Sequence, residues 1–261
     1  MGAEMTGHRF ARALRGLRGR DALPRDVLQD ELTHLDAPDR AIVERALPYT
    51  MTGVARLAAL VDGVRHVVRR DIPGALAECG VWRGGSVLAM ALTLLELGET
   101  DRELHLYDTF EGMTRPTEHD VSVLDGAALS TWDAARAQDR RAWAELFDPR
   151  DFNEDAVRAT LLASGYPAQR IHLHRGPVEE TLPATAPGPL ALLRLDTDWY
   201  ESTRHELEHL YPLLAPGGVL VVDDYGHWQG ARRAVDEYFD AHPPAPLLAR
   251  IDYTGRIAVK P

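Results

Sequence analysis

The 261-residue chain has a single cysteine, Cys79, and this scarcity excludes an intrachain disulfide and a metal site built from several thiolates. Long apolar runs are also missing, because none approaches the roughly 18 residues that a membrane-spanning helix needs. The N-terminus lacks the apolar core of a secretory signal. We therefore expect a cytoplasmic protein with no membrane partner.

An excess of basic residues is absent as well. Lysine and arginine together number 29 against 40 aspartates and glutamates, and the formal net charge is −11. A nucleic-acid-binding surface needs dominant positive charge to neutralise phosphates, so nucleic acid is not an expected partner. The apolar content of 45% is that of an ordinary globular protein, and the length fits one α/β domain.

Two apolar runs of the chain each end in a pair of carboxylates. Residues 192–198 read Leu-Leu-Arg-Leu-Asp-Thr-Asp, and residues 221–224 read Val-Val-Asp-Asp. If the runs are neighbouring parallel strands, all four carboxylates meet at the carboxyl edge of the sheet, where open α/β folds bind ligands. Such carboxylates repel one another unless a cation lies between them or one keeps a proton. The pattern therefore predicts a divalent metal site.

The hydrophobic pattern predicts alternating strands and helices. The expected strands lie near residues 75–80, 103–107, 171–174, 190–195 and 219–222. The expected helices lie near residues 54–71, 87–97, 153–165, 178–182, 201–214 and 230–241. Residues 247–252 and 256–260 indicate a closing antiparallel hairpin. A parallel sheet with an antiparallel C-terminal hairpin and helices on both faces is the Rossmann-like α/β fold of class I S-adenosylmethionine (SAM)-dependent methyltransferases.

Two segments fall outside this alternation. Residues 1–50 contain short amphipathic stretches, which predict an N-terminal helical extension or lid. Residues 113–150 form a long polar insertion that carries Trp132 and Trp143, and these tryptophans favour a folded cap over a disordered segment. We expect a methyltransferase domain over residues 51–261 with this cap inserted.

The turn after the first expected strand, from Glu78 to Gly85, departs from the dinucleotide fingerprint. Trp82 stands where that fingerprint has its second glycine, which lets the backbone approach a pyrophosphate. The turn therefore argues against NAD and FAD. SAM has no pyrophosphate, and Glu78 with the Gly80 turn suits its amino and carboxylate groups. Asp108, at the end of the second strand, is placed to accept hydrogen bonds from both ribose hydroxyls.

The acidic pairs also suggest how a hydroxyl would be activated. Asp196 and Asp198 are two residues apart, and residues two apart in an extended chain point the same way. One can hold a metal ion such as Mg²⁺ while the other takes a proton from a substrate hydroxyl. A sugar diol and a catechol both suit this chemistry. His227 could act as an auxiliary base or a substrate contact, and a solvated loop histidine is the alternative.

Four segments together resemble the macrocin O-methyltransferase family, which includes the mycinamicin and novobiocin sugar O-methyltransferases. They are residues 78–85 (ECGVWRGG), 107–112 (YDTFEG), 195–200 (LDTDWY) and 222–225 (VDDY). The resemblance covers roughly residues 45–261. It implies a SAM- and Mg²⁺-dependent enzyme that methylates a hydroxyl of a deoxysugar on a natural product and releases S-adenosyl-L-homocysteine.

Site residues follow from the resemblance by position. Asp196, Asp223 and Asp224 match the metal ligands of the family, and Asp198 matches its proposed general base. The candidate cofactor-binding residues are Thr50, Met51, Glu78, Gly80, Trp82, Gly84, Ser86, Asp108, Phe110, Gly176 and Asp196. The cap and the first 40 residues match nothing in the family, so the acceptor is left open.

Three alternatives stay open at the level of sequence. A catechol-type O-methyltransferase would use the same cofactor and metal on an aromatic diol. A glycosyltransferase would use Asp196-Thr197-Asp198 as a D-x-D metal motif, and a non-catalytic module would keep only the fold. A glycosylated natural product is the expected small-molecule partner, and we also expect a homo-oligomer, because helical N-terminal extensions often build interfaces.

Overall fold

A computed structural model describes residues 31–261, so most of the N-terminal extension predicted over residues 1–50 lies outside the described residues. The described chain forms a seven-stranded sheet in the order β5-β2-β1-β6-β7-β9-β8. Its strands are β1 (Ala75–Cys79), β2 (Leu104–Asp108), β5 (Ile171–Arg175), β6 (Leu190–Leu195), β7 (Leu214–Val222), β8 (Ala249–Arg250) and β9 (Arg256–Val259). The first five pair in parallel, and β9 pairs antiparallel with both β7 and β8. This is the predicted α/β fold with its terminal antiparallel hairpin.

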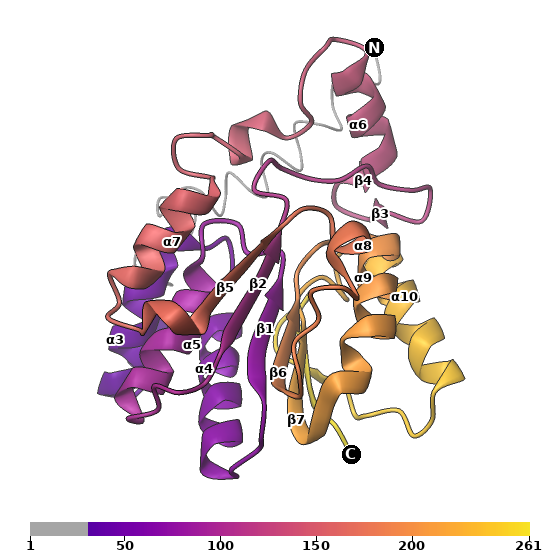
Figure 1. Cartoon of the computed structure of the whole chain (residues 1–261). Helices are drawn as coiled ribbons and strands as arrows, with labels where there is room; N and C mark the ends of the chain where they lie inside the picture. Colours follow the sequence, from indigo (N-terminus) through magenta and orange to yellow (C-terminus); the bar gives the residue numbers. More distant parts are fainter. Residues whose placement is uncertain (1–30) are drawn as a thin grey trace.

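Helices cover both faces of the sheet (Figure 1). One face carries α3 (Ala37–Ala46), α4 (Val54–Arg69), α5 (Gly85–Glu96) and α7 (Glu154–Leu162). The other face carries α8 (Val178–Thr181), α9 (Tyr200–His209) and α10 (Gln229–Ala241). Short 3₁₀ turns complete the chain as η1 (Leu47–Tyr49), η2 (Ala144–Leu146), η3 (Ala168–Arg170) and η4 (Tyr211–Leu213).

The two faces bury alternate residues of each strand, as the period of two in a strand requires. Leu76 and Leu192 pack against α4 and α5, whereas Ala77 and Leu193 pack against the helices of the other face. Because both faces are covered, the central strands are mainly apolar on both sides rather than alternating. A polar residue inside these strands is therefore buried and needs a partner.

Residues 113–150 fold above the carboxyl ends of the parallel strands (Figure 1). This cap contains the hairpin of β3 (Val121–Ser122) and β4 (Gly126–Ala127), followed by α6 (Ala128–Arg136) and η2. Trp143 and Phe147 of the cap are buried against Trp199 and Trp228, which lie at the starts of α9 and α10. The shared aromatic cluster joins the cap to the two segments that follow the acidic strand ends.

The segment between α9 and β7 differs most from the sequence prediction. The helix expected to reach residue 214 ends at His209, and the strand expected from residue 219 begins at Leu214. Pro212 explains the early end, because a proline has no amide to continue the helix and disfavours helical backbone before it. Residues 215–218 then form an irregular start of β7 beside β6. In residues 31–261 no helix is long and apolar enough to cross a membrane.

Candidate active site

A cavity lies at the carboxyl ends of β1, β2, β6 and β7, beneath the cap. It brings together most of the residues predicted from the sequence. The predicted residues that line it are Thr50, Met51, Gly80, Trp82, Ser86, Asp108, Gly176, Asp196, Asp198, Asp223, Asp224 and His227. Three predicted residues, Glu78, Gly84 and Phe110, are not among the lining residues.

The glycine-rich turn is held in place by Asp108. Its Oδ2 accepts hydrogen bonds from the backbone N–H groups of Val81 and Trp82, at 2.7 and 2.9 Å, and its Oδ1 accepts one from Phe110 at 2.8 Å. Burial nevertheless raises the pKa of this carboxyl above its ordinary value, with the three amides opposing the shift. Asp108 thus organises the turn; its predicted contact with a ribose stays a prediction.

Two glycines permit close backbone contacts around the turn. Gly80 has a φ of +82°, and a Cβ there would lie 1.9 Å from the carbonyl oxygen of Asp196. A Cβ at Gly85 would lie 2.6 Å from the side chain of Thr50. Glycine at these positions therefore lets β1, the segment after β6 and the segment before α4 meet at the cavity.

Glu78, predicted to contact the cofactor, lies behind the cavity instead. Its side chain is 1% exposed and forms an ion pair with Arg194, which stands beside it in the register of β1 and β6. Phe110 is also buried in the core, and Gly84 supplies the left-handed residue that begins α5. Residue 78 has the same orientation in β1 as Leu76, so the strand directs its side chain into the α4 face of the sheet.

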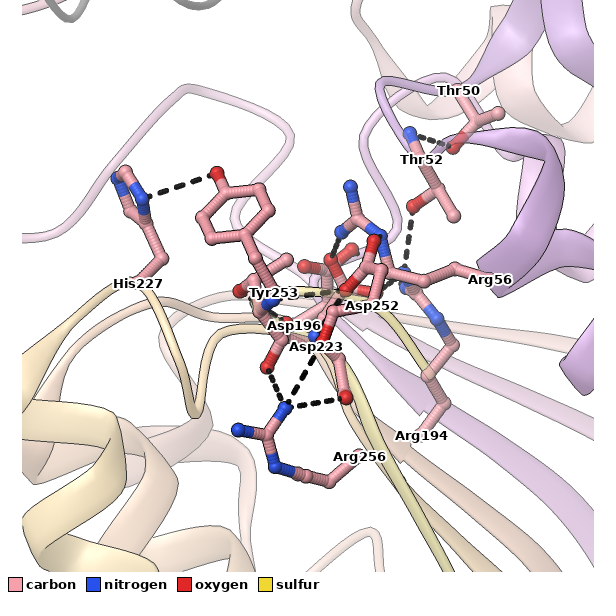
Figure 2. A network of polar contacts seen from close by, with 12 residues as sticks. Thr50, Thr52, Arg56, Arg194, Asp196, Asp223, His227, Asp252, Tyr253 and Arg256 are labelled. Atoms are coloured by element: carbon pink, nitrogen blue, oxygen red, sulfur yellow. Dashed lines mark hydrogen bonds and ion pairs between the residues drawn. The ribbon is translucent and has the colours of Figure 1, made fainter. Parts of the chain in front are cut away.

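Arg194 is the centre of a buried polar network (Figure 2). Its guanidinium, 2% exposed, lies 2.6 Å from the carboxylates of both Asp196 and Asp223 and donates to Thr52 Oγ1 at 2.9 Å. Arg56 of α4 forms a second ion pair with Asp223 and lies 3.0 Å from Asp252. The acidic strand ends thus meet two guanidinium groups that the sequence analysis did not assign to the site.

The acidic groups still outnumber these cations. Six carboxylates, those of Glu78, Asp196, Asp198, Asp223, Asp224 and Asp252, face the two guanidiniums of Arg56 and Arg194, an excess of four when all are ionised. Burial and the neighbouring carboxylates Asp198 and Asp223 hold the pKa of Asp224 well above its usual range. Burial also raises the pKa of Asp223, but Arg194 and Arg56 outweigh it and bring the pKa below its ordinary value. The site therefore carries uncompensated negative charge, which a bound cation or protons would neutralise.

Asp198 occupies a distinct position in this cluster. Burial first, and then repulsion from Asp196, raises its pKa to about 8, while hydrogen bonds with Asp224 and Trp228 oppose the rise. The backbone at Asp198 has a φ of 70°, so the extended geometry assumed for Asp196 and Asp198 is wrong. Both residues line the cavity because the chain turns after β6, not because a strand continues.

Comparison with known proteins assigns this fold to a class. The sheet order and helix arrangement are those of class I SAM-dependent methyltransferases, and the solved structure of the O-methyltransferase NovP superposes with a TM-score of 0.68. NovP is 32% identical, with 81% of this chain and 82% of NovP covered. The structure of the calicheamicin methyltransferase CalS11 shares the fold, with a TM-score of 0.60, 23% identity and 90% of each chain covered.

The amino-acid sequence identifies the family to which the chain belongs. The model of the macrocin-O-methyltransferase (TylF) family matches residues 32–258, and the chain belongs to this family. The 8-demethyl-8-(2,3-dimethoxy-alpha-L-rhamnosyl)-tetracenomycin-C 4'-O-methyltransferase of Streptomyces olivaceus is 33% identical, covering 88% of this chain and 89% of the relative. The demethyldecarbamoylnovobiocin O-methyltransferase of Streptomyces niveus is 32% identical, covering 87% and 84%, respectively. The protein is therefore a SAM-dependent O-methyltransferase, and the glycosyltransferase and non-catalytic alternatives are set aside.

Sequence reasoning missed Arg194, Arg56, Asp125 and Tyr253, which all take part in the site or its network. A signal for Arg194 was present, since an arginine two residues before Asp196 interrupts an otherwise apolar strand. No comparable signal marks Asp125, which reaches the cavity from the cap hairpin.

Proposed function

We propose that the protein transfers the methyl group of SAM to a hydroxyl of a deoxysugar on a secondary metabolite, with a divalent cation such as Mg²⁺ bound beside the acceptor. The observation that carries the proposal is the convergence of four aspartates in one cavity of a macrocin-O-methyltransferase family member. The relatives named above, together with the 30% identical mycinamicin III 3''-O-methyltransferase of Micromonospora griseorubida, carry names of enzymes that act on glycosylated antibiotics.

The donor set suits a hard divalent cation. Asp196, Asp223 and Asp224 each offer a carboxylate oxygen, and these oxygens lie within 4.8 Å of one another. Asp224 Oδ2 is buried and accepts no hydrogen bond from residues 31–261. A buried carboxylate oxygen without a partner is costly unless a ligand satisfies it. When bound, the cation would supply positive charge that stabilises a deprotonated hydroxyl.

The residues of the chain would then position and deprotonate the acceptor. Asp198 lies in the same cavity, and its contacts with Asp224 and Trp228 fix its carboxylate on the acidic cluster. We assign it the role of general base, which takes the hydroxyl proton as the oxygen attacks the methyl carbon. The Gly80 turn, Ser86 and Asp108 would bind SAM so that oxygen, carbon and sulfur lie in line.

The test is methyl transfer from SAM to demethyldecarbamoylnovobiocin, mycinamicin III and a simple catechol, each with Mg²⁺ and with EDTA. We expect transfer to a glycoside that EDTA abolishes. Asp198→Asn should lower kcat by about 10² to 10⁴, the usual contribution of a general base. Calorimetric titration with Mg²⁺ provides a second readout, in which Asp224→Asn loses binding and Asp198→Asn retains it.

The outcomes separate the parts of the proposal. Transfer to the catechol alone would keep the O-methyltransferase chemistry and overturn the sugar acceptor. Glycoside methylation that is insensitive to EDTA, with no measurable Mg²⁺ binding, would overturn the metal. An Asp198→Asn variant with wild-type kcat would overturn the general base.

A further inference from the structure

Asp125 stands out among the acidic residues of the cap. It lies in the turn between β3 and β4, and its side chain is 2% exposed. Its carboxylate lines the same cavity as Asp198, although the two residues come from segments that are 73 positions apart. The cap therefore contributes a buried acidic residue to the lining of the cavity.

The carboxylate of Asp125 lacks the hydrogen bonds that its burial requires. Neither Oδ1 nor Oδ2 accepts a hydrogen bond from any residue of the described range 31–261. His227 Nε2 lies 2.9 Å from Oδ2, which is an ion-pair distance without the alignment of a hydrogen bond. Asp120, the neighbouring buried aspartate of the cap, differs, because it accepts hydrogen bonds from Thr117 and Tyr200. Asp125, a residue that lines the cavity, therefore retains unused acceptor capacity.

A chain of contacts places Asp125 near the proposed general base. The ring of His227 meets the ring of Trp228 edge-on at 4.9 Å, and Trp228 hydrogen-bonds Asp198. Tyr253, from the loop between β8 and β9, lies with its hydroxyl 3.3 Å from His227 Nδ1 (Figure 2). Asp125, His227 and Tyr253 thus form one polar cluster beside Asp198.

We infer that Asp125 is a specificity-determining residue that accepts hydrogen bonds from free hydroxyls of the acceptor sugar next to the one that is methylated. The inference rests on the proposed sugar O-methyltransferase function. An ionised carboxylate is an acceptor only, and two neighbouring hydroxyls present two donors in the matching arrangement. His227 Nε2 lies 2.9 Å from Asp125 Oδ2 and restrains the position of this carboxylate. A sugar with a free hydroxyl beside the reacting one can donate a hydrogen bond to this carboxylate, whereas an acceptor without such a hydroxyl leaves that bond unmade.

The experiment measures binding of the acceptor to the enzyme saturated with S-adenosyl-L-homocysteine, which prevents turnover. The probes are the glycoside that wild-type enzyme methylates and its analogue deoxygenated at the adjacent hydroxyl. Loss of a hydrogen bond to a charged group typically weakens binding by about 10- to 100-fold. Asp125→Asn and Asp125→Ala should weaken binding of the natural acceptor by this factor, and should leave SAM binding unchanged.

Substrate and protein changes are then combined. Wild-type enzyme should bind the deoxy analogue about 10- to 100-fold more weakly than the natural acceptor, whereas Asp125→Ala should bind both alike. Asp133→Asn removes a cap carboxylate that is 61% exposed and should behave as wild type. The unfolding temperature of Asp125→Asn is measured alongside, because the change also alters the contact of residue 125 with His227.

Two results would overturn the inference. One is wild-type affinity for the natural acceptor in both Asp125 variants. The other is a lowered unfolding temperature accompanied by equal loss of binding for both probes, which would give Asp125 a structural role through His227. Failure of wild-type enzyme to methylate any glycoside would instead overturn the proposed function, so the two failures are distinguishable.

Discussion

At the scale of single residues, the site depends on an arginine inside a strand. Arg194 is fully enclosed by the sheet and α4, and its guanidinium joins Glu78, Asp196 and Asp223. A charge buried this deeply is tolerated only because several partners surround it. The same contacts hold two of the proposed metal ligands in place, so a residue of the core also shapes the site.

Replacing Arg194 tests this dependence. Arg194→Met should lower the free energy of unfolding by about 3–5 kcal/mol, because it leaves carboxylates buried without their counter-ion. Urea denaturation measures the change. Arg204→Met, on the exposed face of α9, should cost less than about 1 kcal/mol, although Arg204 also pairs with two glutamates. Adding Glu78→Gln to Arg194→Met should recover part of the loss, and an Arg194→Met enzyme of wild-type stability would contradict this account.

At the scale of elements, the cap is fastened to the start of α9. The N-terminus of this helix has no side-chain cap of its own at Trp199. Asp120 of the cap supplies one instead, since its Oδ1 accepts the backbone N–H of Tyr200 at 2.7 Å and its Oδ2 accepts Thr117 N–H at 2.6 Å. A carboxylate at a helix N-terminus satisfies an unpaired amide and interacts favourably with the helix dipole. The cap and the segment that carries Asp198 are thereby coupled.

Loss of this contact should loosen the cap. Asp120→Ala should lower the free energy of unfolding by about 1–3 kcal/mol, the cost of leaving buried donors unpaired. Hydrogen exchange of the Asp120→Ala variant should be faster than that of wild type at the Tyr200 and Thr117 amides. Amides of β1 serve as the internal reference. Asp133→Ala, also in the cap but exposed, serves as the control. Unchanged protection of the Tyr200 amide would contradict the assignment of Asp120 as the cap of α9.

At the scale of the whole molecule, the pH dependence of stability includes a histidine cluster on β2 and β5, beside Tyr107. His105 and His174 stack across β2 and β5, and His105 Nδ1 lies 3.1 Å from His174 Nε2. Burial, with the neighbouring His105 and His172, lowers the pKa of His174 to about 4. Burial also lowers the pKa of His105, against the opposing hydrogen bond of Glu103. The folded protein therefore keeps these rings neutral at pH values where the unfolded chain binds protons.

The sign of the pH dependence follows from this difference. The unfolded histidine titrates near pH 6.5, so the contribution of His174 to stability is complete above that pH and is lost progressively as the pH falls toward 4. Buried carboxyl groups with raised pKa values have the opposite effect, because they stabilise the folded state as the pH falls. The contribution of His174 is therefore measured by comparing a variant with wild type. His174→Gln should lose less stability than wild type between pH 7 and pH 4.5 in urea denaturation. His34→Gln, at an exposed position, should follow wild type, and parallel curves for His174→Gln and wild type would contradict the assignment.

The sequence by itself determined the alternating order of strands and helices, because the apolar period changes between strand and helix segments and turn residues mark the boundaries. It also predicted the meeting of Asp196 with Asp223 and Asp224, since parallel neighbouring strands end at one edge of a sheet. It could not predict the positions of Arg56 and Asp125, which reach the cavity from α4 and the cap hairpin through contacts with no sequence spacing. Only the tertiary structure decided that Glu78 forms an ion pair with Arg194 instead of lining the cavity, because the register of β1 against β6 sets which side chains lie beside each other.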